Sequence, residues 1–203
     1  MKIICVGRNY ADHVKELKNE LPQSPVVFMK PDTALLKDNQ PFYFPEFSKE
    51  IHFETEVVVK IDREGKFIEE KFAHKYYNEI GLGIDFTARD LQNELKSKGL
   101  PWELAKAFNG SAVVSNFLPK AQLPDVNQLN FSLEINGVER QKGNTSDMIF
   151  SIDYLIAFVS KFFTLKKGDL IYTGTPSGVG AVNIGDILTG SLEGNPMFSF
   201  SIK

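Results

Sequence analysis

Three acidic residues in two segments of the chain could together hold a divalent cation. Glu54 and Glu56 lie two residues apart in a stretch where apolar and polar side chains alternate. Such alternation predicts a strand, on which residues two apart share one face with backbones about 7 Å apart. Asp85 interrupts the apolar run 81–84, where a charge needs a partner. A ligand set made only of carboxylates suits Mg²⁺ or Mn²⁺.

The two glutamates taken alone also fit a strand with a solvated acidic face, which is common in antiparallel sheets. Asp85 favours the metal site, because a solvated face does not explain a charge within an apolar run. We expect one strand over 51–61, which a hairpin turn at 62–66 leads back along the sheet.

A histidine and a glutamate near the N-terminus could form a general-base pair. His13 and Glu16 are three residues apart in a predicted helix over 8–17, with Asn9 as its cap, so they share a face. A carboxylate beside an imidazole orients the ring and raises its basicity. An exposed ion pair on a polar helix fits the same spacing equally well. The polar segment 17–24 is expected to be a mobile loop beside this helix.

Two other features could bind an anion. Lys106 lies between apolar neighbours, and is either a snorkelling surface residue or a cation directed into a cleft. Lys30 is likewise either a solvated lysine or part of an anion pocket. The glycine-rich segment 173–180 follows a predicted strand and could present backbone N–H groups and a hydroxyl. It lacks the Gly-Lys-Ser/Thr ending of a Walker loop.

Turn and periodicity signals place the remaining elements. Asn136-Gly137 predicts a tight hairpin between two strands. A short helix is expected after Thr87, with Arg89 and Gln92 on one face. The apolar spacing over 151–165 predicts a helix with an unusually wide buried face that includes Phe158 and Phe162, as core or subunit contact.

Composition favours one compact domain with its own core, since the chain has 203 residues of which 42% are hydrophobic. The net charge of −3 and the isoelectric point near 5.7 argue against nucleic acid or a membrane as partner. The single cysteine, Cys5, lies in an apolar run and is expected to be a reduced core thiol. With no apparent leader or membrane span, we expect a cytoplasmic protein.

Five motifs, in this order, resemble the fumarylacetoacetate hydrolase family, and its small acylpyruvase branch in particular. They are Gly7–His13, His52–Glu56, Asp85–Asp90, Gly99–Trp102 with Lys106, and Thr173–Gly180. Their order and spacing match along nearly the whole chain. The resemblance implies an α+β, predominantly β fold, a mixed β-roll with a few peripheral helices, in which residues 1–203 form a single catalytic domain. It also implies a homodimer.

The same resemblance assigns roles to residues of these motifs. It implies Mg²⁺ or Mn²⁺ on Glu54, Glu56 and Asp85, catalytic roles for His13, Glu16, Lys106 and Gln92, and substrate binding by Arg8, Tyr10, Arg89 and Thr175. Thr175 matches the family residue that contacts the substrate carboxylate. The segment 17–24 matches a lid.

The expected reaction is metal-dependent hydrolysis of the carbon–carbon bond of an acylpyruvate, of the acetylpyruvate or fumarylpyruvate type. The substrate would chelate the cation through its carboxylate and ketone, while His13, supported by Glu16, takes a proton from the attacking water. Pyruvate would leave as its enolate, whose charge the cation and Lys106 would stabilise.

Two alternatives remain open at this point. Oxaloacetate decarboxylation, or isomerisation or hydration of a related keto acid, would use the same site. A non-catalytic domain stabilised by its metal belongs to a different class, and it gives no reason for a His-Glu pair and a lysine beside the ion.

Overall fold

The computed structural model describes residues 1–16 and 20–203. Residues 17–19 of the predicted lid lie outside the described residues, and 20–24 contain no helix or strand. Among the described residues, no helix is both long enough and apolar enough to cross a membrane.

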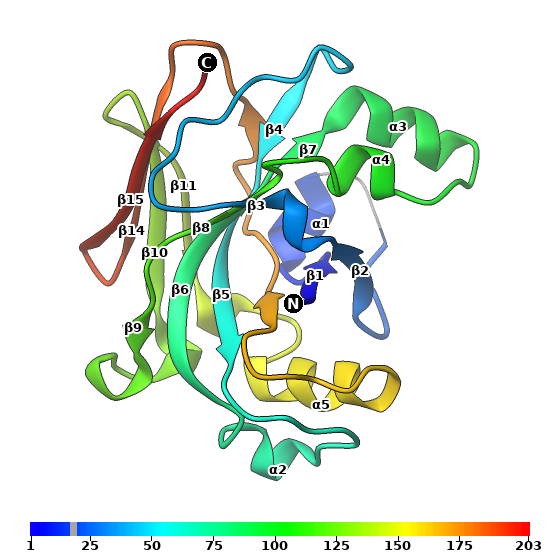
Figure 1. Ribbon diagram of the computed structural model, residues 1–203, viewed down its shortest axis with the longest axis vertical. Coiled ribbons are helices and arrows are strands. Elements are labelled where there is room, and N and C mark those ends of the chain that lie inside the picture. Colours follow the sequence, from blue (N-terminus) through cyan, green and yellow to red (C-terminus); the bar gives the residue numbers. More distant parts are fainter. Residues whose placement is uncertain (17–19) are drawn as a thin grey trace.

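The largest sheet of the described chain has eight strands and lies at the centre of the molecule (Figure 1). Its order is β2 (Val26–Lys30), β1 (Ile3–Gly7), β12 (Leu170–Tyr172), β5 (Thr55–Ile61), β6 (Tyr77–Asp85), β8 (Ala112–Val114) and β3 (Leu35–Leu36), with β9 (Leu118–Pro119) also on β6. The pairs β1–β12 and β3–β8 are parallel and the others antiparallel, so the sheet is mixed.

Two smaller sheets complete the β structure. One has the order β11 (Val138–Asn144), β10 (Asn130–Ile135), β14 (Ile187–Leu192), β15 (Asn195–Ser201), and the other β13 (Gly180–Ala181), β4 (Ile51–Phe53), β7 (Thr87–Ala88). Side chains from both larger sheets, among them Val57, Leu82, Leu133 and Leu188, share one buried core. The expectation of an α+β, predominantly β fold is confirmed.

The helices are short and lie at the periphery. They are α1 (Ala11–Glu16), α2 (Glu70–Ala73), α3 (Arg89–Ser97), α4 (Glu103–Lys106) and α5 (Ile152–Phe162), with 3₁₀ turns η1 (Asp32–Ala34), η2 (Lys120–Gln122), η3 (Val126–Gln128) and η4 (Thr145–Asp147). Figure 1 shows α3 and α4 beside each other near β7, and α2 below α5 at the opposite end of the main sheet.

The expected single strand over 51–61 is wrong, because the chain changes sheets at Glu54. β4 pairs with β7 and β13, whereas β5 pairs with β6 and β12. The N–H of Thr55 donates to the side chain of Gln141 at 2.9 Å instead of joining a strand ladder. This interruption lies at the predicted metal ligand itself.

The predicted hairpin at 62–66 is also wrong as a tight turn. β5 and β6 pair antiparallel, but α2 lies in the connection between them. Gly65 exchanges two backbone hydrogen bonds with Leu165, at 3.0 and 2.8 Å, so the expected turn residues bind the segment after α5. The hairpin at Asn136-Gly137 is confirmed between β10 and β11, and both residues have positive φ, 54° and 77°.

Asn9 does not act as the predicted helix cap. Its side-chain amide donates to the carbonyls of Phe150 and Thr173, and its oxygen accepts from the N–H of Phe150. Asn9 therefore joins the start of α1 to the strand end before the glycine-rich segment. On α5 the predicted buried face is narrower than expected, because Phe162 is 63% exposed.

Candidate active site and metal centre

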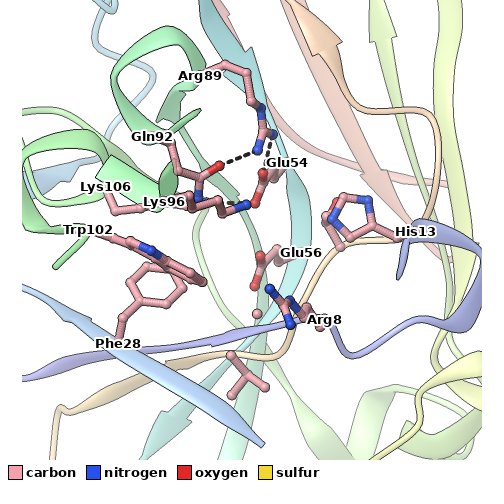
Figure 2. Close-up of a pocket in the computed structure, with 13 residues that line it drawn as sticks. Arg8, His13, Phe28, Glu54, Glu56, Arg89, Gln92, Lys96, Trp102 and Lys106 are labelled. Atoms are coloured by element: carbon pink, nitrogen blue, oxygen red, sulfur yellow. Dashed lines mark hydrogen bonds and ion pairs between the residues drawn. The ribbon is translucent and has the colours of Figure 1, made fainter. Parts of the chain in front are cut away.

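One pocket brings together most of the residues that the sequence motifs single out. Its lining includes Arg8, His13, Glu54, Glu56, Arg89, Gln92, Lys96, Lys106 and Thr175, together with Val6, Gly7, Phe28 and Trp102. Figure 2 shows the side chains from α3 and α4 on one side, Arg8 and His13 on the other, and the two glutamates between them.

The three predicted metal ligands converge inside the protein. Ligand atoms of Glu54, Glu56 and Asp85 lie within 4.8 Å of one another. Asp85 ends β6 and donates its N–H to the carbonyl of Glu54 at 2.8 Å, which fixes the two segments in register. All three residues are buried, at 6%, 2% and 1% exposure, so the alternative of a solvated acidic face is excluded.

Three cations compensate two of these carboxylates. Lys106 Nζ lies 2.8 Å from Glu54 Oε2 and 2.7 Å from Asp85 Oδ2, and Arg89 Nη2 lies 2.5 Å from Glu54 Oε1. Lys30 Nζ lies 2.7 Å from Asp85 Oδ1, an ion-pair contact without the geometry of a hydrogen bond. Although burial alone would raise it, Lys106 and Arg89 hold the pKa of Glu54 well below its usual range.

The negative charge of Glu56 is balanced much less than those of Glu54 and Asp85. Its Oε2 accepts a hydrogen bond from the N–H of Gly174 at 2.7 Å, and no cation within the described residues forms an ion pair with it. Burial, and then the charges of Asp85 and Glu54, raise its pKa well above the usual value. A divalent cation would supply the missing positive charge, and the oxygen-only donor set fits Mg²⁺ or Mn²⁺.

His13 is buried and lines the same pocket, whereas its partner Glu16 lies nearer the surface, so the pair is half-buried. His13 is 5% exposed, and its Nδ1 lies 3.2 Å from Glu16 Oε2. Because a carboxylate accepts, Nδ1 donates, which leaves the Nε2 lone pair for the pocket. Glu16 also accepts from the N–H of Gly178 at 3.0 Å, so the glycine-rich segment holds the carboxylate in place.

Gln92 and Thr175 also line this pocket. Arg89 Nη1 donates to Gln92 Oε1 at 2.6 Å, which leaves the amide hydrogens of Gln92 for a ligand. Thr175 Oγ1 accepts from Gln141 Nε2 at 2.8 Å, which leaves its hydroxyl hydrogen available. Both side chains can therefore donate hydrogen bonds to substrate oxygens.

Arg8 lines the pocket, but Tyr10 is placed elsewhere. Arg8 has φ of 61°, a left-handed conformation that a residue other than glycine rarely adopts. Such strain is typical of functional positions. Tyr10 is 3% exposed, contacts Phe131 edge-on at 6.4 Å between ring centres, and is not among the described pocket residues. The structure gives no support to its predicted contact with substrate.

The sequence analysis did not single out Gln141, which lies on β11 of the four-stranded sheet. Its side chain accepts from the N–H of Thr55, and donates to Thr175 Oγ1 and to the carbonyl of Pro176 at 3.0 Å. Gln141 thus joins the interruption beside Glu54 to the loop that carries Thr175. No local signal indicates this role, because β11 is otherwise a polar, largely exposed strand.

We expect Gln141→Met to weaken substrate binding more than turnover. It would leave buried polar groups unpaired, at a cost of about 1–3 kcal/mol, and release the loop that positions Thr175. KM should rise about tenfold, with a smaller change in kcat. Lys142→Met, at the next and exposed position of β11, is the matched control. Equal losses of stability in both variants, with KM unchanged, would contradict the positioning role.

The predominantly β architecture is that of the fumarylacetoacetate hydrolase fold, and one pocket of it is lined by Glu54, Glu56 and the imidazole of His13. Residues 2–199 match the model of the fumarylacetoacetate hydrolase C-terminal domain. The chain belongs to this family, and the resemblance stated from its motifs is confirmed.

Several relatives have names that refer to oxaloacetate. The chain is 47% identical over 201 residues to the mitochondrial oxaloacetate tautomerase FAHD1 of Rattus norvegicus, covering 99% of this chain and 91% of the relative. It is 42% identical over 194 residues to the mitochondrial oxaloacetate decarboxylase of Dictyostelium discoideum, covering 95% and 89%.

A solved structure of the same fold contains a metal and a keto acid. The chain matches fumarylpyruvate hydrolase from Pseudomonas aeruginosa, in complex with Mn²⁺ and pyruvate, with a TM-score of 0.94 and 33% identity. The match covers 100% of this chain and 89% of that one. These comparisons favour oxaloacetate chemistry, which the sequence left as an alternative, over acylpyruvate hydrolysis as the first candidate.

Proposed function

We propose that the protein is a metal-dependent oxaloacetate tautomerase, which interconverts the enol and keto forms of this 2-keto acid. The observation that carries the proposal is that His13 lines the same pocket as the buried carboxylates Glu54 and Glu56, with its Nε2 left available. The similarity to an oxaloacetate tautomerase, 47% identity over 99% of this chain, supports this choice of reaction and substrate.

The chain's own residues supply the proton transfer. A divalent cation on Glu54, Glu56 and Asp85, when bound, would act as a Lewis acid toward the carboxylate and ketone of the substrate and acidify C3. In the keto-to-enol direction His13 removes the C3 proton through Nε2 and the C2 oxygen takes up a proton from solvent, and in the reverse direction the C2 hydroxyl loses its proton and His13 returns one to C3. Glu16 holds the opposite ring nitrogen and stabilises the protonated imidazole.

The other pocket residues orient the substrate and stabilise charge. Lys106, fixed by Glu54, Asp85 and a 2.6 Å hydrogen bond to Thr87, places an ammonium where negative charge develops on the substrate oxygens. Gln92 and Thr175 can donate to the carboxylate of the 2-keto acid. Groups held this rigidly need little rearrangement during the reaction.

Carbon–carbon bond hydrolysis of acylpyruvates is the second candidate, and the likeness to fumarylpyruvate hydrolase favours it specifically. In that reaction His13 would activate a water molecule instead of removing a C3 proton. Loss of carbon dioxide from oxaloacetate is a third reaction for which the same residues are suited. All three reactions act on a 2-keto acid, which a cation on the three carboxylates would activate.

Metal removal tests the proposal. We expect the protein to accelerate enol–keto equilibration of oxaloacetate, followed by ultraviolet absorbance, by at least about 100-fold over the buffer rate. Chelation should abolish the acceleration, and Mg²⁺ or Mn²⁺ should restore it. Pyruvate release from acetylpyruvate is measured in parallel. Release without any acceleration of enol–keto exchange would favour the hydrolase, and neither activity would contradict both.

We also propose that the protein is a homodimer. A row of aromatic rings with centres 5.3–6.3 Å apart begins at Phe150, just before α5, continues through Tyr154 and Phe158 on the helix, and ends at the exposed ring of Phe162. A second copy would cover this apolar row. Light scattering during gel filtration tests the dimer, and a monomer at micromolar concentration would contradict it.

We propose a reducing compartment such as the cytoplasm as the location of the protein. Cys5 is a free buried thiol, as such a compartment allows.

A further inference from the structure

We propose that Lys96 selects substrates with a second acidic group, by binding the distal carboxylate of a dicarboxylic 2-keto acid. The inference rests on the proposed function and names a determinant of its specificity. Lys96 lies on α3, one turn beyond Gln92 and two turns beyond Arg89, and lines the same pocket. The three side chains therefore come from one face of one helix.

An aromatic wall joins Lys96 to the metal-binding carboxylates. Lys96 Nζ lies 5.2 Å from the centre of the Trp102 ring, and Trp102 packs edge-on against Phe28 with 6.0 Å between ring centres. Lys106 Nζ in turn lies 5.2 Å from the centre of the Phe28 ring. Figure 2 shows Phe28 and Trp102 together beside the two glutamates. A ligand held at the carboxylates can thus extend along this wall to Lys96.

Lys96 forms no ion pair within the described part of the protein. Lys30, Arg89 and Lys106 are paired with Asp85 or Glu54. No carboxylate of the described residues lies within the 4.0 Å of an ion pair to Lys96 or Arg8. Two cations thus remain available to an anion in the pocket.

The surroundings of Lys96 favour an anionic ligand. Burial, and then the neighbouring positive charges of Arg89 and Arg8, lower the pKa of its ammonium to about 8. A carboxylate bound between these groups would remove the repulsion and pair with a half-buried charge. The simpler role, a lysine stem covering Trp102 with its head in solvent, requires no such ligand.

Oxaloacetate and acetylpyruvate distinguish the two roles. Both present a carboxylate and a ketone for chelation, but only oxaloacetate has a second carboxylate. In Lys96→Met, the preference for oxaloacetate over acetylpyruvate, as a ratio of kcat/KM for enol–keto exchange, should fall about 10- to 100-fold, mainly through KM. Lys98→Met is the matched control, because Lys98 is the exposed C-cap residue of the same helix and is paired with Glu94 at 2.6 Å. An unchanged ratio would overturn the proposal.

The pH dependence gives a second readout. Above about pH 8 the wild-type preference for oxaloacetate should decline as Lys96 loses its proton, and in Lys96→Met this decline should be absent. The groups that face Lys96 are Arg89, Arg8, Lys106 and Glu54; of these, Glu54 has a lowered and Lys106 a raised pKa, so neither of the two changes charge near pH 8. A decline that persists in the variant would contradict the assignment to Lys96.

Binding separates failure of this inference from failure of the proposed function. If the wild type converts neither substrate, calorimetry on the Mn²⁺-loaded protein compares 2-oxoglutarate, a dicarboxylic 2-keto acid, with 2-oxobutyrate. The inference then requires that Lys96→Met weaken only 2-oxoglutarate, again about 10- to 100-fold. Equal affinities in wild type and variant would overturn it.

Discussion

Glu56→Gln is expected to abolish metal binding and turnover while leaving the protein folded. The substitution replaces one of three carboxylates that converge within 4.8 Å by a neutral amide, a much weaker ligand for a divalent cation. Without the Lewis acid the substrate is neither chelated nor acidified, so the rate should fall at least about 1,000-fold. The glutamine oxygen can still accept the hydrogen bond from Gly174.

The fold should tolerate this change because of the way the three carboxylates are compensated. Glu56 is the ligand whose pKa burial and neighbouring carboxylates raise, so neutralising it removes repulsion from the metal-free protein. Glu54→Gln differs, since it would leave Arg89 and Lys106 buried with one partner less and cost about 3–5 kcal/mol. Glu56 is therefore the better position for testing the metal centre.

Calorimetric titration with Mn²⁺ and melting curves with and without Mg²⁺ measure the effect. In the wild type, metal should raise the melting temperature, since a ligand that binds only the folded state stabilises it. In Glu56→Gln this rise should be absent. Glu79→Gln, a partly exposed position of β6 paired with Lys60, is the control. A full metal-induced rise in Glu56→Gln would place the metal elsewhere.

Some of the site could be predicted because its signals are local. Asp85 within an apolar run needs compensation wherever it lies, and two glutamates at alternate positions can meet one ion. The spacing of His13 and Glu16 on one helical turn brings them together without any tertiary contact. The hairpin at Asn136-Gly137 has the same local origin.

The remaining parts depend on contacts between segments far apart in the chain. Gln141 interrupts the strand at Glu54 from another sheet, so the alternation around Glu54 predicts one strand where two exist. From the sequence alone, Lys30 and Lys106 could each be exposed to solvent or directed into a cleft. Their ion pairs with Asp85, which is distant in the sequence, show that both are buried. Lys96 resembles any surface lysine of α3 until Trp102 and Arg8 are placed beside it.

His13→Gln is expected to separate proton transfer from metal binding. The variant lacks the base at C3, so enol–keto exchange should fall about 100- to 10,000-fold. Mn²⁺ affinity should stay close to that of the wild type, because none of the three carboxylates is altered. Decarboxylation of oxaloacetate should largely persist, since loss of carbon dioxide requires the metal and Lys106 but no base.

Parallel assays of the two reactions on one protein sample measure this separation. His74→Gln is the matched control, since His74 is an exposed histidine in the connection after α2. Glu16→Gln should show a smaller loss of exchange than His13→Gln, because it disturbs the ring's orientation and basicity but leaves the base in place. Equal loss of exchange and decarboxylation in a folded, Mn²⁺-binding His13→Gln protein would contradict the role of His13 as the C3 base, and would assign it to holding the substrate common to both reactions.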